Sequence, residues 1–245
     1  MEPEFATLGG AEELDEAQCL IWVHAWRWIR PLLRDDGRDV FTPSLTGRGE
    51  RAHLASPEVD LETHVRDVVG TLEFEDLREV ILVGHSYGGP VITGAADRVP
   101  RRIAQLVYLD AEVPREGEAE MDLVPPEERS AYEESANLHG EGWRIPPPLP
   151  DPLPPGLDPD VQWAMSRMVP QPIRTFTQPL HLTTAAPAFR QTYVLHTEGK
   201  EGQELPDYVQ RIRADMDWEF LELAAGHAAH VTAPRQLASL LIGLA

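Results

Sequence analysis

Residues 80–94 read VILVGHSYGGPVITG, and they set the architecture expected for the whole chain. The first four are a continuous apolar run, typical of a strand that is buried on both faces. Pro90 suits the first turn of a helix, which we expect over residues 90–98. Between these two elements stands the pattern G-x-S-x-G, which in this setting is typical of a sharp strand-to-helix turn. The stretch therefore predicts that the Ser86 hydroxyl lies above the carboxyl edge of a parallel sheet.

The residues around Ser86 point to nucleophilic chemistry. Gly84 and Gly88 leave room for the tight turn. The backbone N–H of Tyr87 comes near the N-terminus of the helix, where it can stabilise an oxyanion. The pattern alone also fits a glycine-rich turn with a solvated serine, but its place between strand and helix favours a nucleophile.

A serine hydroxyl needs a base to act as a nucleophile. In proteins with this turn the histidine comes last in the chain. His227 fits, because it follows the apolar run 218–223 and precedes the last predicted helix. His230 is the rival, with packing near that helix as its alternative role, and we expect His85 to pack beneath the turn.

Short apolar runs alternate with amphipathic stretches along much of the chain. This alternation of strands and helices predicts an α/β protein with a mostly parallel sheet and helices on both faces. Strands are predicted over residues 19–23, 39–41, 80–83, 103–109, 190–196 and 218–223, and helices over 26–34, 61–72, 90–98, 205–214 and 234–244.

The alternation breaks in the middle of the chain, which suggests a domain organisation. We expect a core from residues 19–111 and 188–245, preceded by an acidic arm over residues 1–18. Residues 112–187 are rich in proline and glutamate, and proline excludes a central strand or an uninterrupted helix there. We interpret them as a small cap inserted over the sheet. A disordered linker is the alternative, but large apolar residues favour a packed cap: Trp143, Trp163, Met165, Met168 and Phe176.

Composition limits the partners and the cofactors. The 245 residues carry a net charge of −20, which disfavours nucleic acid and anionic membrane surfaces as partners. The single cysteine, Cys19, excludes an internal disulfide and a cysteine-rich metal site. No basic, apolar leader or 18-residue apolar stretch is present, so a cytoplasmic location is expected. No metal site is expected, and a homodimer stays open.

The chain resembles the α/β-hydrolase superfamily, and more closely the small-esterase branch with methylsalicylate esterases, hydroxynitrile lyases and their bacterial relatives. The resemblance runs from about Cys19 to the C-terminus. It rests on residues 43–53 (PSLTGRGERAH), 80–94, 103–114 (IAQLVYLDAEVP) and 226–234. It implies a sheet of about six strands, a small cap, no cofactor, and ester or related acyl-transfer chemistry.

Two departures from this branch concern the catalytic groups. The loop after the first strand supplies a second oxyanion donor in the family, but here it is short and His24 is followed directly by Ala25. Either the Ala25 N–H takes this role or the site has one donor fewer. In the family's usual acid position stands Gly199.

Three carboxylates could orient the histidine in place of the usual acid, and a site without an acid is the remaining alternative. Asp110 ends the strand 103–109, so it lies at the same sheet edge as Ser86, and some α/β-hydrolases take their acid from this position. Glu198 and Glu201 are the alternatives, in the loop that the family uses. Asp110 is our first choice, and its alternative role is to cap a loop or helix.

A third departure concerns the reaction. Ala228 follows His227, where the plant hydroxynitrile lyases carry a lysine, and this argues against cyanohydrin cleavage. The residues and the resemblance together predict a serine hydrolase that cleaves a small uncharged ester through an acyl-enzyme. Two alternatives remain: a lyase or tailoring enzyme on the same fold, or a non-catalytic ligand-binding homologue.

Overall fold

A six-stranded sheet lies at the centre of the computed structural model, which describes residues 18–21, 24–150, 152–183 and 189–244. Its strand order is β2-β1-β3-β4-β7-β8, and every pairing is parallel, which confirms the predicted sheet. The strands are β1 (Gln18–Ile21), β2 (Val40–Phe41), β3 (Val80–His85), β4 (Ile103–Leu109), β7 (Arg190–His196) and β8 (Trp218–Leu223).

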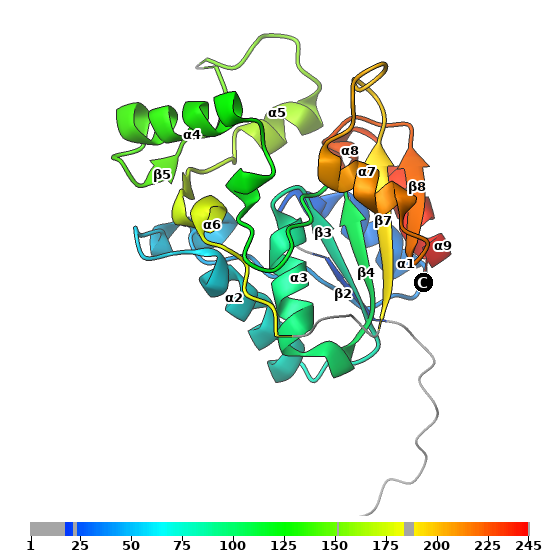
Figure 1. Cartoon of the computed structure of the whole chain (residues 1–245). Helices are drawn as coiled ribbons and strands as arrows, with labels where there is room; N and C mark the ends of the chain where they lie inside the picture. Colours follow the sequence, from blue (N-terminus) through cyan, green and yellow to red (C-terminus); the bar gives the residue numbers. More distant parts are fainter. Residues whose placement is uncertain (1–17, 22–23, 151, 184–188, 245) are drawn as a thin grey trace, which may run out of the picture.

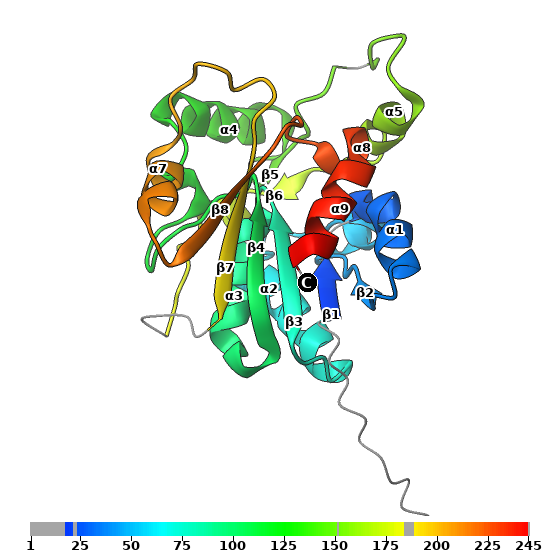
Figure 2. The same ribbon diagram turned by 90° about the vertical axis from the view of Figure 1, so that its right-hand side faces the viewer.

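Helices cover both faces of this sheet (Figures 1 and 2). Successive residues of a strand point to opposite faces: Leu82 of β3 belongs to an apolar cluster with residues of α2, α3 and α7, and Val83 belongs to a second cluster with residues of α1 and α9. Each face of the sheet therefore has its own apolar core. The helices are α1 (Ile29–Asp35), α2 (Leu61–Phe74), α3 (Gly88–Arg98), α7 (Asp207–Ala214) and α9 (Pro234–Leu244).

The predicted helix over residues 26–34 is wrong in its first part. The chain forms a 3₁₀ helix, η1 (His24–Arg27), and α1 begins only at Ile29. Pro31 explains the break, because a proline has no N–H to donate to the carbonyl four residues earlier and its ring clashes there. It is tolerated only in the first turn, which fixes the start of α1. Three further short 3₁₀ helices are η2 (Gly49–Leu54), η3 (Pro100–Arg102) and η4 (Glu120–Asp122).

The segment between β4 and β7 lies over the carboxyl ends of the strands, and it has its own small apolar core (Figure 2). Met121, Ala136 and Ile145 form this core, with Tyr132 and Phe176 packed against it. The segment contains η4, α4 (Pro126–His139), β5 (Arg144–Ile145), α5 (Pro159–Met165), β6 (Gln171–Pro172) and α6 (Arg174–Thr177). Strands β5 and β6 pair antiparallel. No described helix is long and apolar enough to span a bilayer. The arm predicted over residues 1–18 lies almost entirely outside the described residues.

Candidate active site

Ser86 lies on a strained turn between β3 and α3. Its φ of 52° is in the left-handed region, which non-glycine residues rarely adopt. The turn is tightly packed, because a Cβ at Gly84 would lie 2.6 Å from the carbonyl oxygen of Gly88. A Cβ at Gly89 would lie only 1.9 Å from the carbonyl oxygen of Glu112. These contacts explain the glycines at positions 84 and 89, and Ser86 directly follows the buried strand β3.

Asp110 stands beside Ser86 at the end of the neighbouring strand. His85 of β3 pairs in register with Leu109 of β4, so Ser86 and Asp110 are the first residues beyond two adjacent strands. The Ser86 N–H donates to the carbonyl of Leu109, and the Asp110 N–H donates to Val194 of β7. Asp110 also has a positive φ, of 44°. Hydrogen bonds between strands therefore set the position of both residues.

The carboxylate of Asp110 joins two partners from different loops. His227, which follows β8, bonds through Nδ1 to Asp110 Oδ2 at 2.7 Å. Lys200, in the loop after β7, forms an ion pair with Asp110 Oδ1. Burial of Asp110 raises its pKa, but the hydrogen bonds from His227 and Lys200 outweigh this and hold the pKa below its ordinary value. Asp110 is therefore ionised at neutral pH and can orient the imidazole of His227.

Among the described residues, the other two candidate acids form no hydrogen bond or ion pair with His227, although Glu198 Oε2 lies 3.9 Å from the Cβ position of the adjacent Gly226. Glu201 accepts a hydrogen bond from the N–H of Gly199 at 3.1 Å. The N–H of Glu198 donates to the carbonyl of Ala225, which holds the loop after β7 against the loop that carries His227. Of the three carboxylates weighed from the sequence, Asp110 is the one that the structure brings to the histidine.

Lys200 is the residue that sequence reasoning missed. It is the single lysine of the chain. Its position directly after Gly199, in the loop where the family has its acid, was the available signal. A lysine beside the family's usual acid position suggests a charged partner for a carboxylate, but only the fold shows that this loop reaches Asp110.

Three further histidines surround His227. His85 Nε2 and His196 Nδ1 bond to the backbone carbonyl of His227, at 2.7 and 3.3 Å. The ring of His85 lies 4.5 Å from that of His227 and 4.8 Å from that of His230. Burial, helped by the neighbouring imidazoles, lowers the pKa of His85 well below its ordinary value. A neutral His85 that donates to this carbonyl holds the His227 loop in place.

The side chain of Tyr87 is anchored on the far side of the turn. Its hydroxyl lies 2.7 Å from His64 Nδ1, and His64 Nε2 lies 2.8 Å from the carbonyl of Thr46. Burial lowers the pKa of His64 to about 4, so the ring is neutral at pH 7. Since a carbonyl only accepts, His64 donates through Nε2 and accepts from the Tyr87 hydroxyl. This bond fixes the residue whose N–H we expect in the oxyanion hole.

The two expected oxyanion donors lie in different elements. Tyr87 is the N-cap residue of α3, and Ala25 lies in η1. In the described part of the chain, no hydrogen bond is formed by the Ser86 hydroxyl. Nor do the described residues contain a group of three or more His, Cys, Asp or Glu side chains arranged to hold a metal ion.

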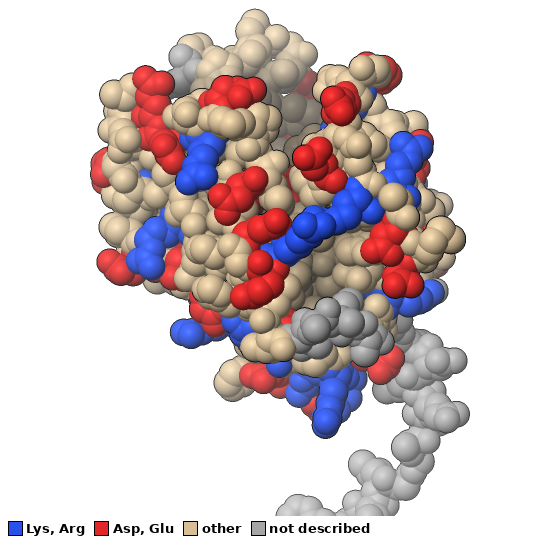
Figure 3. Space-filling view, viewed as in Figure 1, with Lys and Arg blue, Asp and Glu red and all other residues tan. Residues whose placement is uncertain are grey.

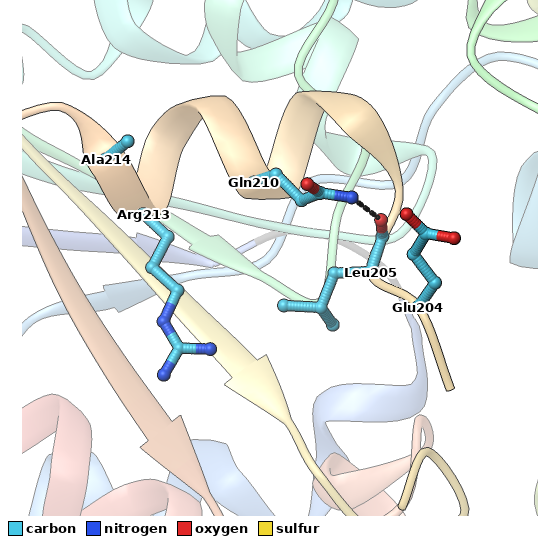
Figure 4. Close-up of a pocket in the computed structure, with 5 residues that line it drawn as sticks. All are labelled: Glu204, Leu205, Gln210, Arg213 and Ala214. Atoms are coloured by element: carbon cyan, nitrogen blue, oxygen red, sulfur yellow. Dashed lines mark hydrogen bonds between the residues drawn. The ribbon is translucent and has the colours of Figure 1, made fainter. Parts of the chain in front are cut away.

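A surface hollow beside α7 is separate from this site (Figure 4). It has a volume of about 440 Å³ and is lined by Glu204, Leu205, Gln210, Arg213 and Ala214. The side-chain amide of Gln210 donates to the carbonyl of Leu205 within it. It contains none of the candidate catalytic residues.

Comparisons with known proteins show the family to which the chain belongs. The model of the alpha/beta hydrolase family matches residues 20–240. A carbendazim hydrolyzing esterase from Nocardioides sp. (strain SG-4G) is 38% identical over 232 residues, covering 91% of this chain and 96% of the relative. An alpha-hydroxynitrile lyase from Arabidopsis thaliana is 34% identical over 93 residues, covering 37% of this chain and 36% of the relative.

A solved structure supports the same fold. It is an extracellular alpha/beta-hydrolase from a Paenibacillus species, described as homologous to tobacco salicylic acid binding protein 2. It superposes with a TM-score of 0.76 at 23% identity, over 92% of this chain and 98% of that chain. With the family match and the long, 38% identical esterase relative, the chain belongs to the alpha/beta hydrolase family.

Proposed function

We propose that this chain is a carboxylic ester hydrolase with Ser86 as nucleophile, His227 as general base and acid, and Asp110 as the orienting acid. The observation that carries the proposal is the 2.7 Å bond between His227 and Asp110, at the sheet edge where Ser86 occupies its strained turn. The esterase named among the relatives supports the reaction class.

The reaction begins at the ester carbonyl. Ser86 Oγ attacks the carbonyl carbon while His227 Nε2 takes the hydroxyl proton. The Asp110 carboxylate accepts from Nδ1–H, so it fixes the tautomer that leaves Nε2 free for this proton, and it stabilises the imidazolium. The N–H of Tyr87, with that of Ala25 as second donor, stabilises the oxyanion.

Collapse of the tetrahedral intermediate breaks the bond to the alcohol, which leaves with the proton from His227. A water molecule then attacks the acyl-enzyme, His227 again acts as base, and the acid product leaves Ser86 free. We propose small esters as substrates, with no nucleic acid or membrane as partner, because the net charge is −20. The single cysteine fits a cytoplasmic enzyme.

Labelling with a small fluorophosphonate, followed by intact mass, tests the nucleophile. We expect one adduct on the wild type and none on Ser86→Ala. Asp110→Asn should lower kcat by a factor on the order of 10⁴, as loss of a triad acid does elsewhere. Glu198→Gln and Glu201→Gln are matched controls and should keep most of the activity. An adduct independent of Ser86, or a larger loss in Glu198→Gln, would contradict the assignment.

The panel of substrates should include carbendazim, which the 38% identical relative is named for hydrolysing. Product analysis separates hydrolysis from the alternative of a lyase, because only hydrolysis yields an acid and an alcohol. A folded protein that neither forms the adduct nor turns over any ester would support a ligand-binding role instead.

A further inference from the structure

The cap touches the segment after β1 through an aromatic cluster that the mechanism does not use. Helix α5 lies apart from α4 and contacts α8 (Ala229–Thr232), the helix that follows the catalytic histidine (Figure 2). The ring of Trp163 in α5 meets that of Trp28 edge-on, with centroids 5.2 Å apart and planes at 86°. The guanidinium carbon of Arg27 lies 4.3 Å from the Trp163 ring centroid and 5.4 Å from that of Trp28. Trp163 therefore contacts the last residue of η1 and the residue after it.

The tryptophan ring, and not a carboxylate, sets the place of the arginines in this cluster. Acidic side chains gather over α4 on the face seen in Figure 3, yet in the described part of the chain neither Arg27 nor Arg167 forms an ion pair. The guanidinium carbon of Arg167 lies 4.2 Å from the Trp163 centroid, and its Nη1 donates to the Trp163 carbonyl at 3.2 Å. A cation is attracted to the negative face of an indole ring. Arg167 thus holds the ring from the side of the cap, and the ring holds Arg27.

The register of the sheet brings η1 to the edge where Ser86 lies. Strands β1 and β3 are parallel neighbours, and Ile21 pairs with Val83. His24, the first residue of η1, comes three residues after Ile21, just as Ser86 comes three residues after Val83. Ala25, whose N–H we propose as the second oxyanion donor, is the next residue of η1. The segment that Trp163 contacts is therefore the one that carries this donor.

The core holds one side of η1 and the cap holds the other. Trp26 is buried, and its ring lies 5.7 Å from that of His230 in α8. Arg27 is exposed and Trp28 half-buried, and in the described part of the chain the ring contacts that they make beyond each other are with Trp163. The hydrogen bonds of a 3₁₀ helix have poor geometry, so such a helix depends on contacts with its surroundings. Loss of the Trp163 ring would leave the outer side of η1 without its aromatic support.

We propose that Trp163 is a positioning residue for the oxyanion hole: through Arg27 and Trp28 it keeps η1 where the Ala25 N–H acts as second donor. This inference rests on the proposed function and gives the cap a role in the chemical step. Oxyanion donors are effective because they are held in place before the reaction, so a donor that moves stabilises the transition state less. The Tyr87 N–H belongs to the serine turn and does not depend on α5. The oxyanion hole is therefore complete only while α5 lies on η1.

Two esters that differ in one atom test the proposal: p-nitrophenyl acetate and its thiono analogue, which has C=S in place of C=O. Sulfur is larger and accepts weaker hydrogen bonds, so an intact oxyanion hole favours the oxygen ester. Complete loss of an oxyanion donor costs on the order of 10²–10³ in kcat, so for a loosened donor in Trp163→Ala we expect a fall of about tenfold on p-nitrophenyl acetate. KM should change less than about twofold, because a group that acts only in the transition state affects kcat. The ratio of kcat/KM for the oxygen ester to that for the thiono ester should fall severalfold.

The chain offers a matched control for this change. Trp143 also lies in the cap and has the guanidinium carbon of Arg144 5.1 Å from its ring centroid, but both of these residues belong to the cap. Trp143→Ala should therefore leave kcat and the ester ratio unchanged. Trp163→Phe keeps an aromatic ring on η1 and should restore most of the ratio. Arg27→Met should lower the ratio in the same direction as Trp163→Ala and add little to it in the double variant, because the two residues share one contact.

Three results would overturn the proposal: an unchanged ester ratio in Trp163→Ala, an equal fall of the ratio in Trp143→Ala, or a loss confined to KM. The last of these is expected of a tryptophan that only lines the substrate pocket. If Trp163→Ala does not fold, Arg27→Met and Trp163→Phe still decide, because the first changes an exposed side chain and the second keeps the ring.

Hydrogen exchange separates this inference from the proposed function, because it needs no turnover. We expect the backbone amides of residues 24–28 to exchange faster in Trp163→Ala than in the wild type or in Trp143→Ala. Unchanged exchange would refute the support of η1 by α5 even if ester hydrolysis by Ser86 is established. Faster exchange with no hydrolysis of any ester would mean that the proposed function fails while the support of η1 stands. Faster exchange with an unchanged ester ratio would refute the link to the oxyanion hole.

Discussion

Replacement of Lys200 by methionine tests how the site depends on its ion pair. Lys200 is the single lysine of the chain, and its Nζ contacts Asp110 Oδ1 while His227 contacts Oδ2. The Asp110 side chain is 4% exposed and the Lys200 side chain 35%. Methionine keeps most of the length and apolar surface of the lysine stem, so the change removes mainly the charge.

The cost follows from these two exposures. A fully exposed ion pair contributes about 0.2–1 kcal/mol. Removal of one partner from a fully buried pair costs about 3–5 kcal/mol. Because solvent screens the Lys200 end and Asp110 keeps its bond to His227, we expect a loss of about 1–2 kcal/mol, between these limits. For 245 residues this lowers Tm by roughly 2–8 °C.

The pH profile of kcat/KM should also change in Lys200→Met, which would not happen if Lys200 had only a structural role. If the same energy positions Asp110 for catalysis, kcat/KM falls about tenfold, since 1.4 kcal/mol corresponds to a factor of ten. Without the lysine, the full charge of Asp110 acts on the imidazolium of His227. The acid limb of the pH profile of kcat/KM should therefore move to higher pH.

The assay is the pH dependence of p-nitrophenyl ester hydrolysis, with thermal unfolding measured in parallel. Lys200→Arg should restore the profile, and Arg213→Met, which removes an exposed cation paired with Glu222, is the matched control. In a double-mutant cycle with Asp110→Asn the two losses should not add, because the residues share one contact. Additive losses, or an unshifted acid limb in Lys200→Met, would refute the reasoning.

Further predictions concern packing, protonation and the cap. Gly89→Ala brings a Cβ to 1.9 Å from the carbonyl oxygen of Glu112, so we expect a loss of about 2–3 kcal/mol in chemical denaturation. Gly70→Ala in α2 meets nothing within 4 Å and should instead gain about 0.5–1 kcal/mol. The pKa of His64 is lowered by burial to about 4 in the folded protein, so the unfolded chain binds more protons below pH 6.5. Stability should therefore fall between pH 6.5 and 4, by up to about 3 kcal/mol, and in His64→Phe this part of the pH dependence should disappear. Asp60→Ala removes the N-cap that accepts from the N–H of Thr63 in the first turn of α2, and should lower the free energy of unfolding by about 1 kcal/mol; an unchanged urea midpoint would contradict this.

The parts of the site that follow one another closely in the sequence could be predicted. The G-x-S-x-G pattern, flanked by a buried strand and a helix, predicts the position of Ser86 because local sterics determine that turn. The place of Asp110 follows from its position at a strand end. Lys200 could not be assigned, since its contact with Asp110 spans 90 residues and depends on where a loop returns. The contact of Trp163 with Trp28 depends in the same way on where the cap folds back, and proline-rich segments carry little periodicity from which packing can be predicted.

The register of β3 and β4 also bears on how this chain can change. Ser86 and Asp110 each stand one residue beyond the end of a paired strand. The register of β3 and β4 therefore sets their spacing, which does not depend on the loop after β7. In the family that loop carries the acid, so its length must keep the carboxylate within reach of the histidine. If Asp110 is the acid, as we propose, residues 201–204 are free of this constraint, and insertions or exchanges there can change access to the site as long as Lys200 still reaches Asp110.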